Sequence, residues 1–118
     1  MKLKVYEYPR CSTCRKALQY LQSNEIDFKK IDISLQPPSK TELKKMLKLY
    51  DGKLKKLFNT SGQVYRQKKL GTTLDDMTVD EAIDLLADDG MLVKRPFLLS
   101  DNGGLVGFKK EQWDALLI

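Results

Sequence analysis

The sequence predicts an α/β fold with a mixed four-stranded sheet and a helical insert between the second and third strands. Three observations predict it: a strand-helix-strand pattern over residues 2–33, a series of helical patterns over residues 39–90, and a hairpin followed by a helix over residues 97–117. A strand-helix-strand unit favours a parallel strand pair, whereas a hairpin is antiparallel. We therefore expect one sheet with both kinds of pairing.

Length and composition are those of an ordinary globular domain. The 118 residues are 42% hydrophobic and 31% charged, and no run approaches the roughly 18 apolar residues that span a bilayer. We expect a single soluble domain over residues 1–118, present as a monomer. Residues 1–5 alternate in charge and lack the apolar run of a signal peptide, which indicates a cytosolic location.

The formal net charge of +5 comes with lysines that are spread along predicted helices. Such lysines most often form solvated helix faces, and we expect no nucleic acid or membrane partner. A positive charge would still suit a small anion or an acidic protein.

The first 33 residues contain the first three predicted elements. Residues 1–8 alternate, with Leu3 and Val5 opposite Lys2 and Lys4, which predicts a strand that ends before Pro9. Apolar positions then recur at helical spacing over residues 12–23, and residues 28–33 predict a second strand.

Two capping boxes, each a Ser or Thr three residues before a Glu, predict two longer helices in the middle of the chain. They consist of Ser39 with Glu42 and of Thr78 with Glu81. We expect these helices to end near Gly52 and Gly90. Residues 54–58 and 63–70, which lie between them, predict shorter helices.

The last part of the chain predicts a hairpin and a helix. Residues 97–99 and 105–108 flank the turn-rich residues 100–104, and residues 110–117 form a helical pattern with Trp113 facing inward. The order strand, helix, strand, several helices, strand, strand, helix is that of a thioredoxin-like fold with a helical insert.

The two cysteines, Cys11 and Cys14, are the chemical feature of the chain. A structural zinc site usually needs four Cys or His ligands, and the sequence has two cysteines and no histidine, so we expect no metal. Cys11 precedes the first predicted helix, where unpaired N–H groups and the helix dipole favour a thiolate. Cys14 is expected to point toward the core and to resolve a mixed disulfide. A pair of buried cysteines without a function remains an alternative.

The same helix N-terminus predicts a cradle for a substrate. Its N–H groups, together with the hydroxyls of Ser12 and Thr13, could hold a tetrahedral oxyanion above Cys11. Arg15 adds positive charge nearby.

Four blocks of sequence carry a resemblance to a known family. They are Tyr8-Pro9-Arg10-Cys11-Ser12-Thr13-Cys14-Arg15-Lys16-Ala17, Pro37-Pro38, Lys94-Arg95-Pro96 and Val106-Gly107-Phe108. On these residues the chain resembles the arsenate reductase-like family that includes the Spx-type regulators, nearly from end to end. The resemblance implies that Pro96 is a cis proline facing Cys11 and that Arg95 points at the substrate pocket.

The chain also departs from the arsenate-reducing members of that family. Members that depend on glutaredoxin place two further arginines around the oxyanion, and Asn59 and Phe108 occupy the matching positions here. Arginine makes bidentate contacts with oxyanions, so we expect weak arsenate reduction, although Thr60, Ser61 and Arg66 could replace some of the contacts. Those members have one cysteine in the loop, whereas this chain has two.

Two classes of function follow. The first is a thiol-disulfide oxidoreductase that acts on a disulfide or a small oxyanion, with no bound cofactor and with glutathione, glutaredoxin or thioredoxin as the reductant. The second is a Spx-like regulator in which the Cys11/Cys14 pair changes binding to RNA polymerase. Asp51-Gly52 lies where the regulators contact a partner, although it also suits a helix C-cap. The end of the sequence after the Trp113 helix favours the enzyme.

Overall fold

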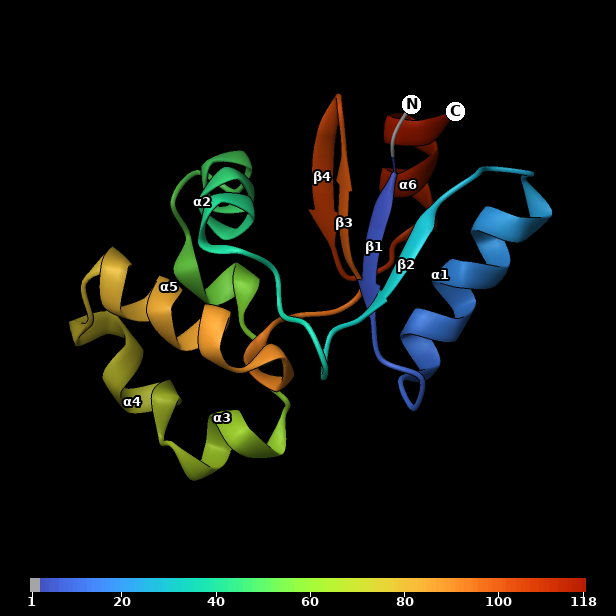
Figure 1. Cartoon of the computed structure of the whole chain (residues 1–118). Helices are drawn as coiled ribbons and strands as arrows, with labels where there is room; N and C mark the ends of the chain where they lie inside the picture. Colours follow the sequence, from blue (N-terminus) through green and yellow to red (C-terminus); the bar gives the residue numbers. More distant parts are fainter. Residues whose placement is uncertain (1–2) are drawn as a thin grey trace.

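Four strands form one mixed sheet in the order β2-β1-β3-β4 (Figure 1). A computed structural model describes residues 3–118, so Lys2 lies outside the described residues. The strands are β1 (Lys4–Glu7), β2 (Lys29–Asp32), β3 (Phe97–Ser100) and β4 (Gly103–Val106). β1 is parallel to β2 and antiparallel to β3, and β3 is antiparallel to β4. The predicted mixed sheet is confirmed.

Helices cover both faces of this sheet (Figure 1). The helices α1 (Ser12–Ser23) and α6 (Lys110–Leu117) pack on one face, where Val5, Leu21 and Trp113 belong to one hydrophobic cluster. The helical insert covers the other face, where Tyr6 and Met46 belong to a second cluster. Successive strand residues point to opposite faces, so Val5 and Tyr6 enter different clusters. Tyr6 lies on the same face of β1 as Lys4. The face that was expected to be charged is therefore partly buried.

The insert contains the two predicted longer helices, each with its capping box. Its elements are α2 (Lys40–Leu49), η1 (Leu54–Leu57), α3 (Gln63–Gln67), α4 (Leu70–Thr73), η2 (Leu74–Asp76), α5 (Val79–Asp88) and η3 (Gly90–Leu92). The prediction of one helix over residues 63–70 is wrong. Lys69 has a φ of 55°, a left-handed conformation that ends the helical hydrogen bonding, so α3 and α4 are separate.

The hairpin turn is tighter than predicted. Gly103 and Gly104 belong to β4, and only Asp101 and Asn102 form the turn. A Cβ atom on Gly104 would lie 2.8 Å from the carbonyl oxygen of Leu98, so this strand position has no room for a side chain. The strand ends before Gly107, whose φ of 75° favours glycine.

The insert and the sheet meet at Gly90. A Cβ atom there would lie 1.8 Å from the carbonyl oxygen of Ile33, so the two backbones touch. Immediately afterwards the N–H of Lys94 donates to the oxygen of Leu57 at 2.8 Å, and the N–H of Asn59 donates to the oxygen of Leu92 at 2.7 Å. These bonds place residue 59 beside the segment that leads into β3.

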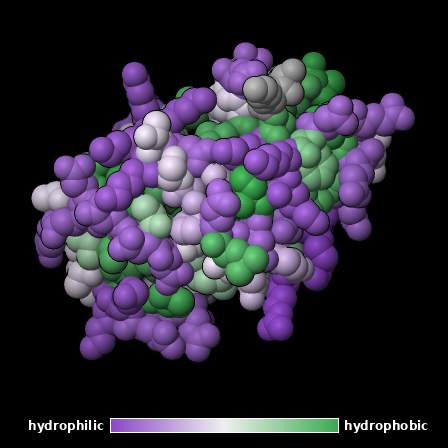
Figure 2. All heavy atoms as spheres, viewed as in Figure 1, coloured by the Kyte–Doolittle hydropathy of each residue, from purple (hydrophilic) through white to green (hydrophobic). Residues whose placement is uncertain are grey.

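The surface is mostly polar on the face shown in Figure 2, with apolar atoms in separate patches. Within residues 3–118, no helix has the length and apolar character needed to cross a membrane.

The contact at Gly90 generates a stability prediction. Gly90→Ala forces a methyl group against the Ile33 backbone and should lower the free energy of unfolding by about 1–3 kcal/mol or more. Gly71→Ala is the matched control, because its nearest contact is Tyr65 Cε1 at 3.9 Å and helical alanine is favoured over glycine by about 0.5–1 kcal/mol. Urea denaturation measures both variants. Equal stability of the two variants would contradict the close approach.

Candidate active site

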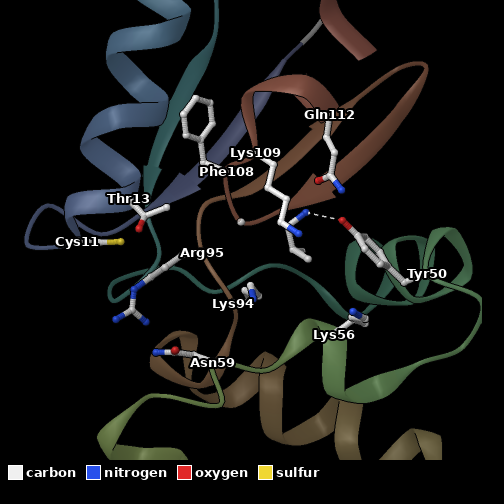
Figure 3. Close-up of a pocket in the computed structure, with 12 residues that line it drawn as sticks. Cys11, Thr13, Tyr50, Lys56, Asn59, Lys94, Arg95, Phe108, Lys109 and Gln112 are labelled. Atoms are coloured by element: carbon white, nitrogen blue, oxygen red, sulfur yellow. Dashed lines mark hydrogen bonds between the residues drawn. The ribbon is translucent and has the colours of Figure 1, made fainter. Parts of the chain in front are cut away.

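Cys11 is the N-cap residue of α1. Its backbone is extended, with φ −90° and ψ 116°, and its Sγ accepts a hydrogen bond of 3.3 Å from the backbone N–H of Cys14. Its own N–H donates to the oxygen of Tyr8 at 3.0 Å, which closes the turn after β1. The Cys11 sulfur is thus held at the helix N-terminus, half-buried, and it lines a pocket (Figure 3).

Cys14 lies in the first turn of α1 with none of its surface exposed. Burial, with a smaller contribution from the hydrogen bond with the Cys11 sulfur, raises the pKa of the Cys14 thiol to about 12. A hydrogen bond with the Tyr8 backbone and the charge of Arg95 act in the opposite direction. Cys14 is therefore protonated at neutral pH. The two sulfurs have different environments: one borders a pocket and the other lies in the core.

The pocket in front of Cys11 has a volume of about 420 Å³. It lies between the helix N-terminus, the insert and the end of the hairpin (Figure 3). Its lining residues are Cys11, Thr13, Tyr50, Lys56, Asn59, Lys94, Arg95, Val106, Gly107, Phe108, Lys109 and Gln112. Four of them are cationic and none is acidic, so the pocket carries positive charge beside the Cys11 sulfur.

Backbone and buried hydrogen bonds fix the hairpin wall of this pocket. The N–H of Gly107 donates to the oxygen of Pro96 at 2.8 Å, and the buried Trp113 Nε1 donates to the oxygen of Gly107 at 3.1 Å. On the same wall the N–H of Val106 donates to Tyr50 Oη at 3.1 Å (Figure 3). Val106 and Gly107 are therefore held by the Tyr50 side chain, by Pro96 just before β3 and by Trp113 of α6.

Arg95 is held against the same pocket by the residues around it. Its guanidinium carbon lies 5.1 Å from the centre of the Tyr8 ring, a cation–π contact, and its Nη1 donates to the oxygen of Met91 at 3.3 Å. Its Nε is buried and has no hydrogen-bond partner among residues 3–118. The charge of Arg95 is thus kept beside the cysteines.

The structure brings some predicted site residues together and leaves others apart. Thr13 and Arg95 line the pocket with Cys11, and the Arg95–Pro96 peptide bond is cis, as predicted. Ser12 and Arg15 do not line the pocket: Ser12 is exposed, and Arg15 Nη1 donates to the oxygen of Pro9 at 3.2 Å.

The positions that were expected to lack arginine are at the pocket. Asn59 and Phe108 both line it. The suggested substitutes Thr60, Ser61 and Arg66 do not line this pocket, and Thr60 and Arg66 border a separate depression. They cannot replace the missing contacts in this conformation.

Sequence reasoning missed three lysines of the pocket, Lys56, Lys94 and Lys109. The lysines of the chain had been interpreted as solvated helix faces, and Lys56 lies in such a run. Two of the three had a local signal, because Lys94 precedes Arg95-Pro96 and Lys109 follows Phe108. Lys56 had none, since only the insert brings it to the pocket.

The protein belongs to the class of thioredoxin-like proteins: its sheet has that topology, two cysteines lie at a helix N-terminus, and a cis proline is nearby. Comparison with known sequences then gives the family. The chain belongs to the ArsC family, whose profile matches residues 6–116.

Its relatives include proteins of known and unknown role. The uncharacterized protein YusI of Bacillus subtilis is 46% identical over 114 residues, with 97% of each chain covered. The regulatory protein MgsR of Bacillus subtilis is 30% identical, with 91% of this chain and 83% of MgsR covered. An ArsC family related protein from Bacteroides fragilis has a solved structure with a TM-score of 0.92, 45% identity and 98% of each chain covered.

The different environments of the cysteines predict different alkylation rates. A Cys14→Ser variant, which retains Cys11, should react with iodoacetamide near neutral pH, because the Cys11 sulfur borders the pocket. A Cys11→Ser variant, which retains Cys14, should react at least about tenfold more slowly, because that thiol is buried and protonated. Mass spectrometry over time measures both rates. Equal rates in the two folded variants would contradict the assignment.

Proposed function

We propose that this protein is a thiol-disulfide oxidoreductase of the arsenate reductase-like type, with Cys11 as the nucleophile and Cys14 as the resolving cysteine. The observation that carries the proposal is the arrangement of the two sulfurs. The Cys11 sulfur borders the cationic pocket, and the fully buried Cys14 donates its backbone N–H to that sulfur at 3.3 Å.

The proposed reaction has two exchange steps. In the first, the Cys11 thiolate attacks one sulfur of a substrate disulfide, the substrate S–S bond breaks, and half of the substrate leaves as a thiolate that takes a proton from water. In the second, the Cys14 thiolate attacks the Cys11 sulfur, the mixed S–S bond breaks, and the other half of the substrate leaves as a thiolate that takes a proton from water. The substrate gains two electrons, and the protein is left with a Cys11–Cys14 disulfide.

The second step requires Cys14 to lose its proton. Burial is the largest cause of its raised pKa of about 12 and persists in the mixed disulfide, so the thiolate fraction stays small at neutral pH. Below this pKa the fraction grows about tenfold for each pH unit. Resolution is therefore expected to be slower than attack, and to accelerate as the pH rises.

An external thiol completes the cycle. Glutathione, glutaredoxin or thioredoxin supplies the two electrons that restore the dithiol, so the chain needs no bound cofactor for this chemistry. The charge of Arg95, which lines the pocket, lowers the pKa of the Cys14 thiol and so favours the thiolate that the second step needs.

Arsenate is a poor candidate substrate for this site. Asn59 and Phe108 line the pocket where the resemblance places arginines, and neither side chain provides a charge-assisted bidentate contact. Loss of two such contacts, each worth about 1.5–3 kcal/mol, corresponds to an efficiency lower by roughly a hundredfold or more. Lysines in the pocket supply charge without that geometry.

A regulator with a redox switch is the second candidate, and the similarity to curated regulators favours it. The Global transcriptional regulator Spx of Lactiplantibacillus plantarum is 28% identical, with 92% of this chain and 80% of the regulator covered. In that role the Cys11/Cys14 pair would change binding to RNA polymerase without turnover. A pull-down of RNA polymerase with the reduced and the oxidised protein separates the two roles.

Turnover of hydroxyethyl disulfide tests the proposed enzyme. With thioredoxin as the reductant, Cys11→Ser should reduce the rate to the background, because no other thiol borders the pocket. Cys14→Ser should accumulate a mixed disulfide when the reductant is omitted, which appears as a mass increase of half the substrate. Ser12→Ala is the control and should keep its activity, because Ser12 lies outside the pocket. Full activity of Cys11→Ser would overturn the proposal.

A further inference from the structure

Three lysines surround the space in front of Cys11, and each comes from a different segment (Figure 3). Lys56 belongs to η1 of the insert, Lys94 lies in the segment that leads into β3, and Lys109 lies between β4 and α6. The catalytic sulfur and three primary amines thus share one pocket of about 420 Å³.

The backbone around these lysines is fixed by contacts that do not involve their amines. The N–H of Lys94 donates to the oxygen of Leu57 at 2.8 Å, which ties the segments of Lys94 and Lys56 together. A Cβ atom on Gly107 would lie 3.2 Å from Lys94 Cε, so the stem of Lys94 passes directly over Gly107. Lys109 lies two residues after Gly107, whose backbone is held by the Pro96 oxygen and the Trp113 side chain.

The charges of these lysines are available to a ligand. The ion pairs found among residues 3–118 use Lys4, Lys40, Lys44 and Lys110, and none uses a lysine of the pocket. No acidic side chain lines the pocket either. All three side chains are exposed, so their amines can reach an incoming anion without first breaking an ion pair.

The chemistry of these groups favours an organic anion over a compact oxyanion. A lysine amine is a point charge on a flexible stem, so it can meet a carboxylate at a variable distance from Cys11. The pocket volume is that of sites for small organic molecules. Phe108 adds apolar surface, and Asn59 and Gln112 add amide groups that can bind neutral parts of a ligand.

We propose that Lys56, Lys94 and Lys109 make this site selective for small disulfides that carry carboxylates. The inference rests on the proposed exchange at Cys11 and adds the substrate class and the residues that determine it. A cationic cleft raises the local concentration of an anionic substrate and its rate of association by about tenfold or more. The preference should weaken as salt screens the amines, which are exposed.

Three disulfides of similar size and different charge test this selectivity. Dithiodipropionate is anionic, hydroxyethyl disulfide is neutral and cystamine is cationic. The kcat/KM of the full chain is measured with each of them, with thioredoxin as the reductant, and divided by the rate of free dithiothreitol with the same disulfide. The division removes differences in leaving-group reactivity. We expect the order anionic, neutral, cationic, with about tenfold or more between the extremes at low salt.

Charge-neutralising variants assign the selectivity to the lysines. Lys56→Gln, Lys94→Gln and Lys109→Gln together should lower the ratio of anionic to neutral turnover by about tenfold, and each alone should lower it by less. Lys68→Gln makes the same change in charge as each single variant, at an exposed lysine outside the pocket, and should leave the ratio unchanged. Thermal unfolding confirms that the triple variant is folded.

The outcomes separate the inference from the proposed function. Equal normalised rates for the three disulfides would overturn the proposed selectivity. If turnover of the neutral disulfide still depended on Cys11, the proposed oxidoreductase function would be retained. A folded triple variant with an unchanged ratio, or an equal fall in Lys68→Gln, would overturn the assignment to these lysines. An absence of Cys11-dependent turnover of every disulfide would overturn the proposed function itself.

Discussion

The hydrogen bond from the Cys14 backbone N–H to the Cys11 sulfur is the interaction on which the site depends. It caps α1 with a sulfur atom, where most helices use a side-chain oxygen, and so it fixes that sulfur at the positive end of the helix. Cys14 lies in the first turn of the same helix. With Cys11 at the cap position, the Cys11 sulfur borders the pocket and the Cys14 sulfur is buried. The proposed division between nucleophile and resolving cysteine follows from this local geometry.

The segment from Gly90 to Gly107 assembles the rest of the pocket around that sulfur. Gly90 touches the backbone after β2, the segment pairs with residues 57–59 of the insert, and the oxygen of Pro96 accepts the N–H of Gly107. One continuous stretch therefore fixes the positions of the sheet, the insert and the end of the hairpin relative to one another. The cations that it gathers in front of Cys11 account for the proposed preference for anionic substrates.

Local patterns predicted most of the fold, and long-range contacts explain where they failed. Both capping boxes, the helix after Cys11 and the parallel pair follow from periodicity and cap chemistry within a few residues. The left-handed conformation of Lys69 has no signal in the sequence pattern, and the strand position of Gly104 depends on its close approach to the Leu98 backbone. In the site, Cys11, Thr13 and Arg95 were found from motif and resemblance, whereas the pocket lysines were missed because three separate segments bring them together.

The central claim is that Cys11 and Cys14 form one redox couple, and the mass of a single peptide tests it most directly. Trypsin cleaves after Arg10 and Arg15, so residues 11–15 leave the protein together with both cysteines. After mild oxidation with diamide, this peptide should be lighter by two hydrogens, and dithiothreitol should restore its mass. An oxidised protein in which Cys11 carries a sulfenic acid or an intermolecular disulfide while Cys14 remains a free thiol would contradict the account.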